Sequence, residues 1–161
     1  MNKTLTKSVV LGLMVLSGSA ANAADVTGNA TAKISSAITV TEDTAMAFGT
    51  ILKDATGATL VLNTVGGVSG APAGYTLSGS PASAAFTASG DPGAPVSLSF
   101  ASGSLTGPGT AMALDGFTHN AGAAFDGAGS LSFNVGASLT VGANQISGDY
   151  AGTYTVTVNY Q

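Results

Sequence analysis

Apolar and polar side chains alternate with a period of two along much of the chain after residue 24. The clearest run is the last one, where Tyr154, Val156 and Val158 alternate with Thr155 and Thr157. Successive side chains of a β-strand point to opposite faces of a sheet. This run therefore predicts a strand with one face in the core and the other in water.

The same alternation recurs in short runs that Gly, Pro, Asn and Asp separate. Residues 96–100 and 131–135 alternate clearly, and weaker candidate strands span residues 45–52, 59–65, 75–78, 84–89, 111–118 and 137–141. Turn signals include Asp91-Pro92-Gly93 and Asp126-Gly127, because Gly accepts a positive φ and Asp bonds its own backbone. No window shows helical spacing. We expect one all-β domain, a sandwich or barrel, with seven to nine strands in two sheets.

The larger apolar residues on the alternating faces form the predicted core. They are Phe48, Leu62, Phe86, Leu98, Phe100, Leu114, Phe133, Leu139, Tyr154 and Val156. The chain contains no cysteine, so burial of such residues has to stabilise the fold without disulfide bonds.

The first 23 residues have the pattern of a signal peptide. Lys3 and Lys7 precede an apolar stretch over residues 9–16, and Ala21-Asn22-Ala23 is a small-x-small cleavage site. We expect export, cleavage after Ala23 and a single domain over residues 24–161, located in the periplasm, at the cell surface or outside the cell. No later stretch approaches the ~20 apolar residues of a membrane-spanning helix, so no span is expected after cleavage.

Residues 26–40 form an unusually long alternating run. Its even positions from the start are Val26, Gly28, Ala30, Ala32 and Ile34. Strands in globular domains average about five or six residues, so a run of this length has to bend, divide or reach beyond its own domain. Residues 24–40 are therefore either an ordinary first strand or a donor strand, which would complete the sheet of another copy. The five named residues are candidate assembly residues.

The composition includes few residues that could bind nucleic acid, hold a metal ion or act in catalysis. There is no arginine and there are four lysines, of which only Lys33 and Lys53 follow the signal peptide, so neutralisation of nucleic-acid phosphates is excluded. The single histidine, His119, stands beside no recognisable nucleophile motif, and no phosphate-binding or metalloprotease motif occurs. We expect no enzyme activity, no cofactor and no metal site.

Three stretches carry a resemblance to a known family: residues 32–51 with Phe48-Gly49-Thr50, residues 86–93, and residues 139–160. On these the mature chain resembles a bacterial exported family described as domain of unknown function 4402. Its ending is more distantly similar to pilin subunits of the chaperone-usher and spore-coat-U-like type, in which a Gly and a penultimate Tyr match Gly148 and Tyr160. That resemblance implies an immunoglobulin-like sandwich lacking one strand, with a periplasmic chaperone and an usher as partners. Unlike most pilins, the chain lacks paired cysteines.

Two functions follow as expectations. The first is a structural subunit of a surface fibre or extracellular matrix, in which copies of this chain or a related subunit join by β-strand addition. Gly148, Tyr154 and Tyr160 are further candidate assembly residues for it. The alternative is a self-contained secreted adhesin or binding module whose loops contact a ligand.

Overall fold

The computed structural model describes residues 23–52 and 56–161, so the predicted signal peptide lies outside the described residues except for Ala23. The chain divides into a first unit ending at Lys33 and a second unit, Ile34–Gln161. In the first unit, residues 23–33 are exposed and form no strand. Among the described residues, no helix is long and apolar enough to cross a membrane.

The second unit is an antiparallel β-sandwich, as the alternation predicts. Its ten strands in the described part are β1 (Thr39–Thr44), β2 (Thr50–Leu52), β3 (Ala58–Leu62), β4 (Val68–Ser69), β5 (Thr76–Ser78), β6 (Ala84–Ser89), β7 (Val96–Thr106), β8 (Met112–His119), β9 (Ser130–Val141) and β10 (Ala151–Tyr160). The number of strands exceeds the expected seven to nine because it includes three very short strands. These are β2, β4 and β5, each of two or three residues.

The largest sheet follows the order β1-β6-β9-β8-β7-β10, and β2 pairs with β5 in a separate small sheet. β9 is the longest strand and changes partner along one edge, from β6 to β3. Gly136 lies at this change, where a Cβ atom would overlap the carbonyl oxygen of Leu62. A residue without a side chain therefore lets β9 pair with two strands on the same edge.

Several expected strands have other bounds in the structure, and β3 ends at Leu62 although the expected strand extends to residue 65. The expected strand over residues 45–52 is wrong across residues 45–49, since β1 ends at Thr44 and β2 begins at Thr50. Gly49 has a φ of +74°, and a Cβ there would lie 2.6 Å from the carbonyl oxygen of Ser78. This conformation interrupts the strand. Residues 131–135 and 137–141 belong to one continuous strand, β9.

The core consists of two apolar clusters, one around Phe86 and Phe133 and the other around Leu60 and Leu139. Six of the predicted core residues are buried: Phe48, Leu62, Phe86, Leu114, Phe133 and Leu139. The other four, Leu98, Phe100, Tyr154 and Val156, are half-buried. They belong to β7 and β10, and β10 is an end strand of the sheet, which leaves their side chains covered on fewer sides.

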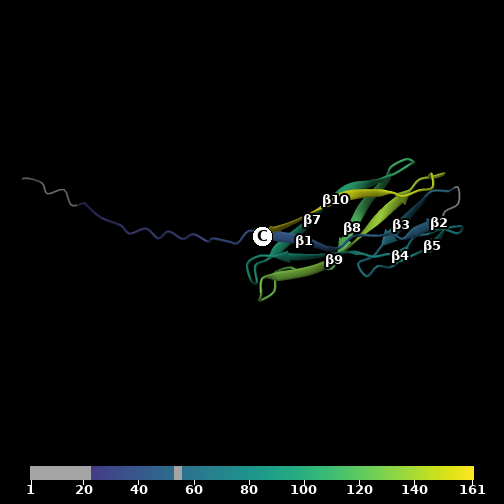
Figure 1. The fold of residues 1–161 in the computed structure, drawn as a ribbon. Coiled ribbons are helices and arrows are strands. Elements are labelled where there is room, and N and C mark those ends of the chain that lie inside the picture. Colours follow the sequence, from purple (N-terminus) through teal and green to yellow (C-terminus); the bar gives the residue numbers. More distant parts are fainter. Residues whose placement is uncertain (1–22, 53–55) are drawn as a thin grey trace, which may run out of the picture. The chain divides into compact units, whose positions relative to one another are not determined.

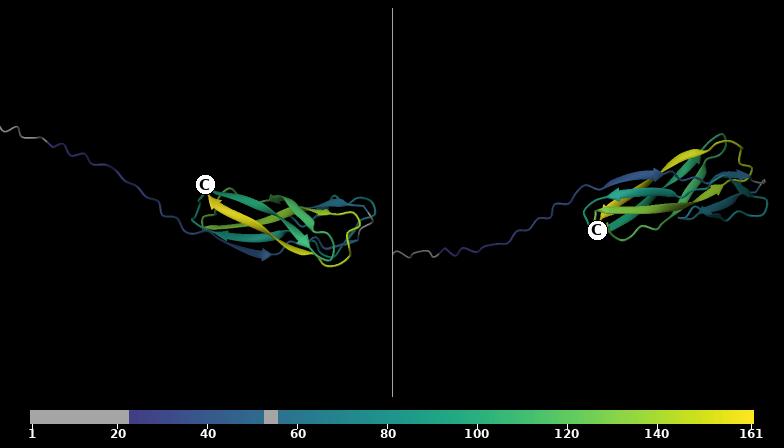
Figure 2. Two further views of the ribbon diagram at one scale, coloured as in Figure 1. Left: turned by 90° about the horizontal axis from the view of Figure 1, so that it is seen from above. Right: turned by 60° about the horizontal axis from the view of Figure 1, so that its bottom comes forward.

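The first and last strands of this sheet each have one free edge. β1 pairs only with β6 and β10 only with β7 among the described strands. Figures 1 and 2 show that the C-terminus lies beside the start of β1. The two end strands thus lie near one another without hydrogen-bonding as neighbours.

Candidate functional site

A groove with a volume of about 1190 Å³ opens between the two end strands. One wall comes from β1 and the segment leading into β2, over residues 40–52. The other comes from residues 145–156, which form the start of β10 and the loop before it. The floor consists of apolar residues from β6 to β9, five of them buried and Leu105 half-buried: Phe86, Leu105, Met112, Leu114, Leu139 and Val141.

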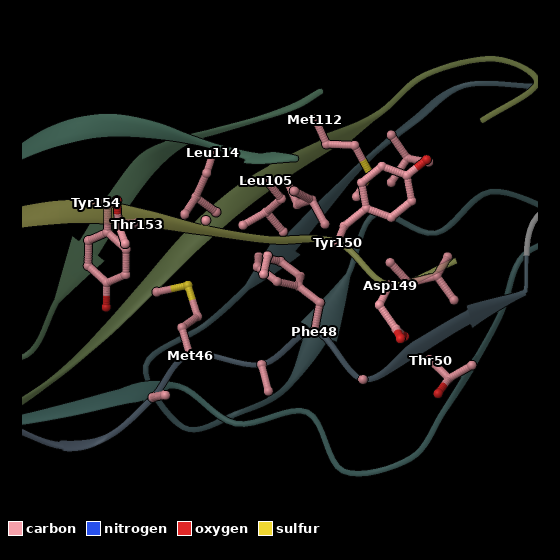
Figure 3. Close-up of a pocket in the computed structure, with 18 of the residues that line it drawn as sticks. Met46, Phe48, Thr50, Leu105, Met112, Leu114, Asp149, Tyr150, Thr153 and Tyr154 are labelled. Atoms are coloured by element: carbon pink, nitrogen blue, oxygen red, sulfur yellow. The ribbon is translucent and has the colours of Figure 1, made fainter. Parts of the chain in front are cut away.

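The groove therefore reaches the apolar core. In Figure 3, Met46 and Phe48 lie on the side of the segment between β1 and β2, while Tyr150 and Tyr154 come from the opposite wall. Both walls include the free edge of a strand, which presents unpaired backbone N–H and C=O groups. An apolar floor between two strand edges is the environment that an extended peptide with alternating apolar side chains occupies in strand addition.

Tyr154 places a polar atom in this apolar groove. Its hydroxyl oxygen is buried and has no hydrogen-bond partner among the described residues. Its ring stacks on Phe117 with centroids 5.0 Å apart and meets Phe86 edge-on at 6.4 Å. Burial, and secondarily the charge of Glu42, raises the pKa of Tyr154 to about 12. A group that enters the groove and hydrogen-bonds this hydroxyl would remove the cost of leaving it unpaired.

Beyond one end of the groove, three residues from distant parts of the chain form a hydrogen-bonded cluster, which we call the clamp: Ser36, Asp91 and Tyr160. The Tyr160 hydroxyl donates to the Ser36 carbonyl at 2.9 Å and accepts from the Asp91 backbone N–H at 2.8 Å. The Ser36 N–H donates to Asp91 Oδ1 at 2.8 Å. The clamp holds the chain just before β1 against the last residue of β10.

The clamp is built on a packed aromatic base. The Tyr160 ring meets the buried Phe125 ring at a centroid distance of 5.9 Å. Gly90 lies against both rings, and a Cβ at that position would come within 2.7 Å of the Tyr160 hydroxyl. Because Gly90 has no side chain, the Tyr160 phenol can occupy this space.

The structure separates the residues predicted for assembly. Tyr154 and Gly148 line the groove, and Tyr160 belongs to the clamp beyond it. Gly148 has a φ of +150° and packs on Pro108, a conformation that favours glycine. The five N-terminal residues Val26, Gly28, Ala30, Ala32 and Ile34 are exposed and lie outside any strand, with Val26 and Ile34 each 95% exposed.

Sequence reasoning did not single out Met46 and Met112 as groove residues. Both lie in weaker candidate strands, residues 45–52 and 111–118, whose alternation marks a buried face but does not distinguish a groove from the core. Methionine is flexible and polarisable, and it recurs at surfaces that accept apolar partners, which is the one signal that could have found them.

His119 makes ordinary local contacts. Its Nδ1 accepts the Ala121 N–H at 3.2 Å, and its ring lies 5.6 Å from that of Phe100. Within residues 23–52 and 56–161, no group of three or more His, Asp or Glu side chains is placed to hold a metal ion.

Comparison with known proteins places the chain in a family. A search of curated proteins and a search of solved structures each gave no match. A family model described as "Domain of unknown function (DUF4402)" matches residues 38–160, which is most of the chain and all ten strands. Residues 24–37 precede the matched region. The chain belongs to the DUF4402 family.

Proposed function

We propose that this protein is an exported structural subunit of a bacterial surface fibre or extracellular matrix, and that its copies join by β-strand addition. In this proposal residues 24–35, which we call the arm, enter the groove of a second copy. The observation that carries the proposal is the open groove between β1 and β10, whose floor is the apolar core. An open groove of this kind leaves a sandwich one strand short.

The arm has the pattern that the groove requires. In an extended strand its even positions, including Val26 and Ile34, would face the floor, while its odd positions would face water. Burying a Val or Ile side chain contributes roughly 1.5–3 kcal/mol, and two strand edges would supply main-chain hydrogen bonds. Exposed in a lone subunit, these same side chains favour association.

The arm is also long enough for the groove. Ile34 stands eight positions after Val26, which corresponds to about 26 Å of extended strand. On the β10 wall of the groove, residues 151–156 provide a strand edge of roughly 17 Å, which the arm is long enough to cover. The small residues Gly28, Ala30 and Ala32 lie between the two larger ones, so the middle of the arm requires little depth.

Charge supports the same pairing. Lys33 occupies an odd position of the arm, which would remain at the rim of the groove. Glu42 and Asp149 line the two walls of that groove. A cation on the arm and carboxylates on the groove favour association between copies, since complementary charges steer encounter and fix the register.

The proposal includes a role for helper proteins before assembly. An open apolar groove exposes surface that promotes aggregation, so it requires a temporary cover between export and polymerisation. The resemblance to chaperone-usher pilins implies a periplasmic chaperone for that step and an usher for secretion. Both remain part of this proposal.

Deletion of the arm tests the proposal. We expect the mature chain to form polymers, while a variant lacking residues 24–35 remains a folded monomer by size-exclusion chromatography with light scattering and by circular dichroism. A synthetic peptide of residues 24–35 should then bind this variant. The matched control is the same peptide carrying Val26→Asp and Ile34→Asp, which should not bind. A mature chain that stays monomeric at high concentration would overturn the proposal and favour a self-contained adhesin or binding module.

A further inference from the structure

We infer that the clamp of Ser36, Asp91 and Tyr160 prevents each arm from filling the groove of its own subunit and thereby directs it to a second copy. This inference rests on the proposed function. It concerns which copy receives the arm, and the clamp itself takes no part in binding it.

A subunit with an arm and a matching groove faces a competition between two reactions. The arm is tethered at Ser36, and the groove wall begins at Val40, only four residues further along the chain. A short tether gives an effective concentration in the millimolar range, which exceeds the concentration of free subunits in most settings. Without a barrier the arm would fill its own groove, and the product would be a closed monomer.

To enter its own groove, the arm would have to reverse direction just before β1 and pair with the free edge of that strand. Tight hairpin turns require residues that accept a positive φ, chiefly Gly, Asn or Asp. Residues 31–41 contain none of these. A wider loop would use Lys33–Ser35 as the turn and would remove Ile34, one of the two largest apolar residues of the arm, from the strand.

The clamp holds the backbone at the point where such a reversal would occur. Both main-chain polar groups of Ser36 are engaged, the N–H by Asp91 and the carbonyl by Tyr160. The Tyr160 ring packs on buried Phe125, so its hydroxyl has a fixed position. Reversal at residues 35–38 would therefore break two hydrogen bonds in addition to forming an unfavourable turn.

An arm that cannot close on its own subunit leaves the groove of that subunit open to the next arm. The resulting contact is heterologous, since arm and groove are different surfaces. Heterologous contacts extend into open filaments when the rotation between copies does not close a ring. The clamp thus accounts for linear growth between copies of one chain.

The absence of cysteine from the sequence permits a direct test. Lys33→Cys in the arm and Thr153→Cys at the exposed rim of the groove are introduced together into the mature chain, which is then treated with a short bismaleimide cross-linker. Cross-links between copies give a ladder on a denaturing gel. Cross-links within one copy give a monomer whose cysteines are joined, as peptide mapping identifies.

With the clamp intact we expect the ladder. Tyr160→Phe, which removes the hydroxyl, should raise the ratio of internal to intermolecular cross-links several-fold. A second variant adds Ser35→Asn and Ser36→Gly to Tyr160→Phe; it supplies a favourable turn and should raise the ratio further. Tyr75→Phe is the matched control, since it removes a hydroxyl that bonds the Thr56 carbonyl, and it should leave the ratio unchanged.

The outcomes separate this inference from the proposed function. Internal cross-links predominating in the parent protein, or a ladder that none of the clamp variants reduces, would overturn the inference while leaving pairing of arm and groove intact. The absence of any cross-link would instead overturn the proposed function and the inference with it. Should Tyr160→Phe fail to fold by circular dichroism, Asp91→Ala removes the acceptor of the Ser36 N–H and provides the same comparison.

Discussion

Tyr154 and Glu42 lie on opposite walls of the groove, and the charge of Glu42 adds to burial in raising the pKa of Tyr154 to about 12. The two residues belong to the last and first strands of the sheet, which do not pair with each other. The Glu42 carboxylate and the Tyr154 hydroxyl lie on the two sides of an open groove, and the hydroxyl has no hydrogen-bond partner among the described residues. The interaction between the two groups therefore depends on what fills the groove.

This relationship predicts a loss of stability at high pH. An unfolded Tyr ionises near pH 10, so between pH 10 and 12 the unfolded chain loses a proton that folded Tyr154 keeps. Stability should therefore fall as pH rises through this window, by an amount on the order of 1 kcal/mol, because the Tyr154 side chain as a whole is only half-buried and solvent screens part of the effect. Denaturant unfolding of the arm-deleted subunit at pH 9 and pH 11 measures it.

Tyr154→Phe should show a smaller decline than the parent protein over the same window, and Glu42→Gln an intermediate one. At pH 7 Tyr154→Phe should be close to neutral in stability, because the hydroxyl that it removes has no partner among the described residues. Identical declines in the parent and Tyr154→Phe would show that another group titrates.

A second prediction concerns Gly152 in β10. A Cβ atom at this position would overlap the carbonyl oxygen of Ser104 on β7. Backbone cannot move aside as a flexible side chain can, so Gly152→Ala should destabilise the subunit by about 2 kcal/mol or more. Gly127→Ala is the matched control, since nothing lies within 4 Å of its Cβ, and it should change stability by less than about 0.5 kcal/mol. Thermal and urea unfolding compare the two.

A third prediction separates the two faces of the arm. Ile34→Asp should strongly weaken polymers of the mature chain, because a charge would be buried in the apolar groove. Ser35→Asp adds the same charge at the adjacent, outward position and should leave polymers largely intact. Electron microscopy and size-exclusion chromatography of both variants provide the measurement. If both variants lose polymers to the same extent, the added negative charge is the cause. That result would contradict the assignment of Ile34 to the inward face of the arm and Ser35 to the outward face.

The predicted export signal has its own test. Intact-mass measurement of protein recovered from the periplasm or the medium should give a chain that begins at Ala24. Retention of residues 1–23 would contradict cleavage and would remove the basis for placing the subunit outside the inner membrane.

The local features of this protein follow from short stretches of its sequence. Alternation predicts β6 over residues 84–89 and the inward, half-buried face of β10, because the pleat of a strand depends only on neighbouring residues. Composition likewise excludes thiol chemistry without reference to any fold. The alternation over residues 26–40 fits both an ordinary strand and a donor strand, since both require the same pattern.

Which strands lie at the edges of the sheet, and where the groove opens, depends on the packing of the whole domain. Strand pairing depends on packing between segments far apart in the chain, and no short window of sequence records it. Tyr160 and Ser36 are 124 residues apart, yet their hydrogen bond fixes where the chain enters β1. The same packing left Tyr154 half-buried on the groove wall, although its alternation is that of a core residue.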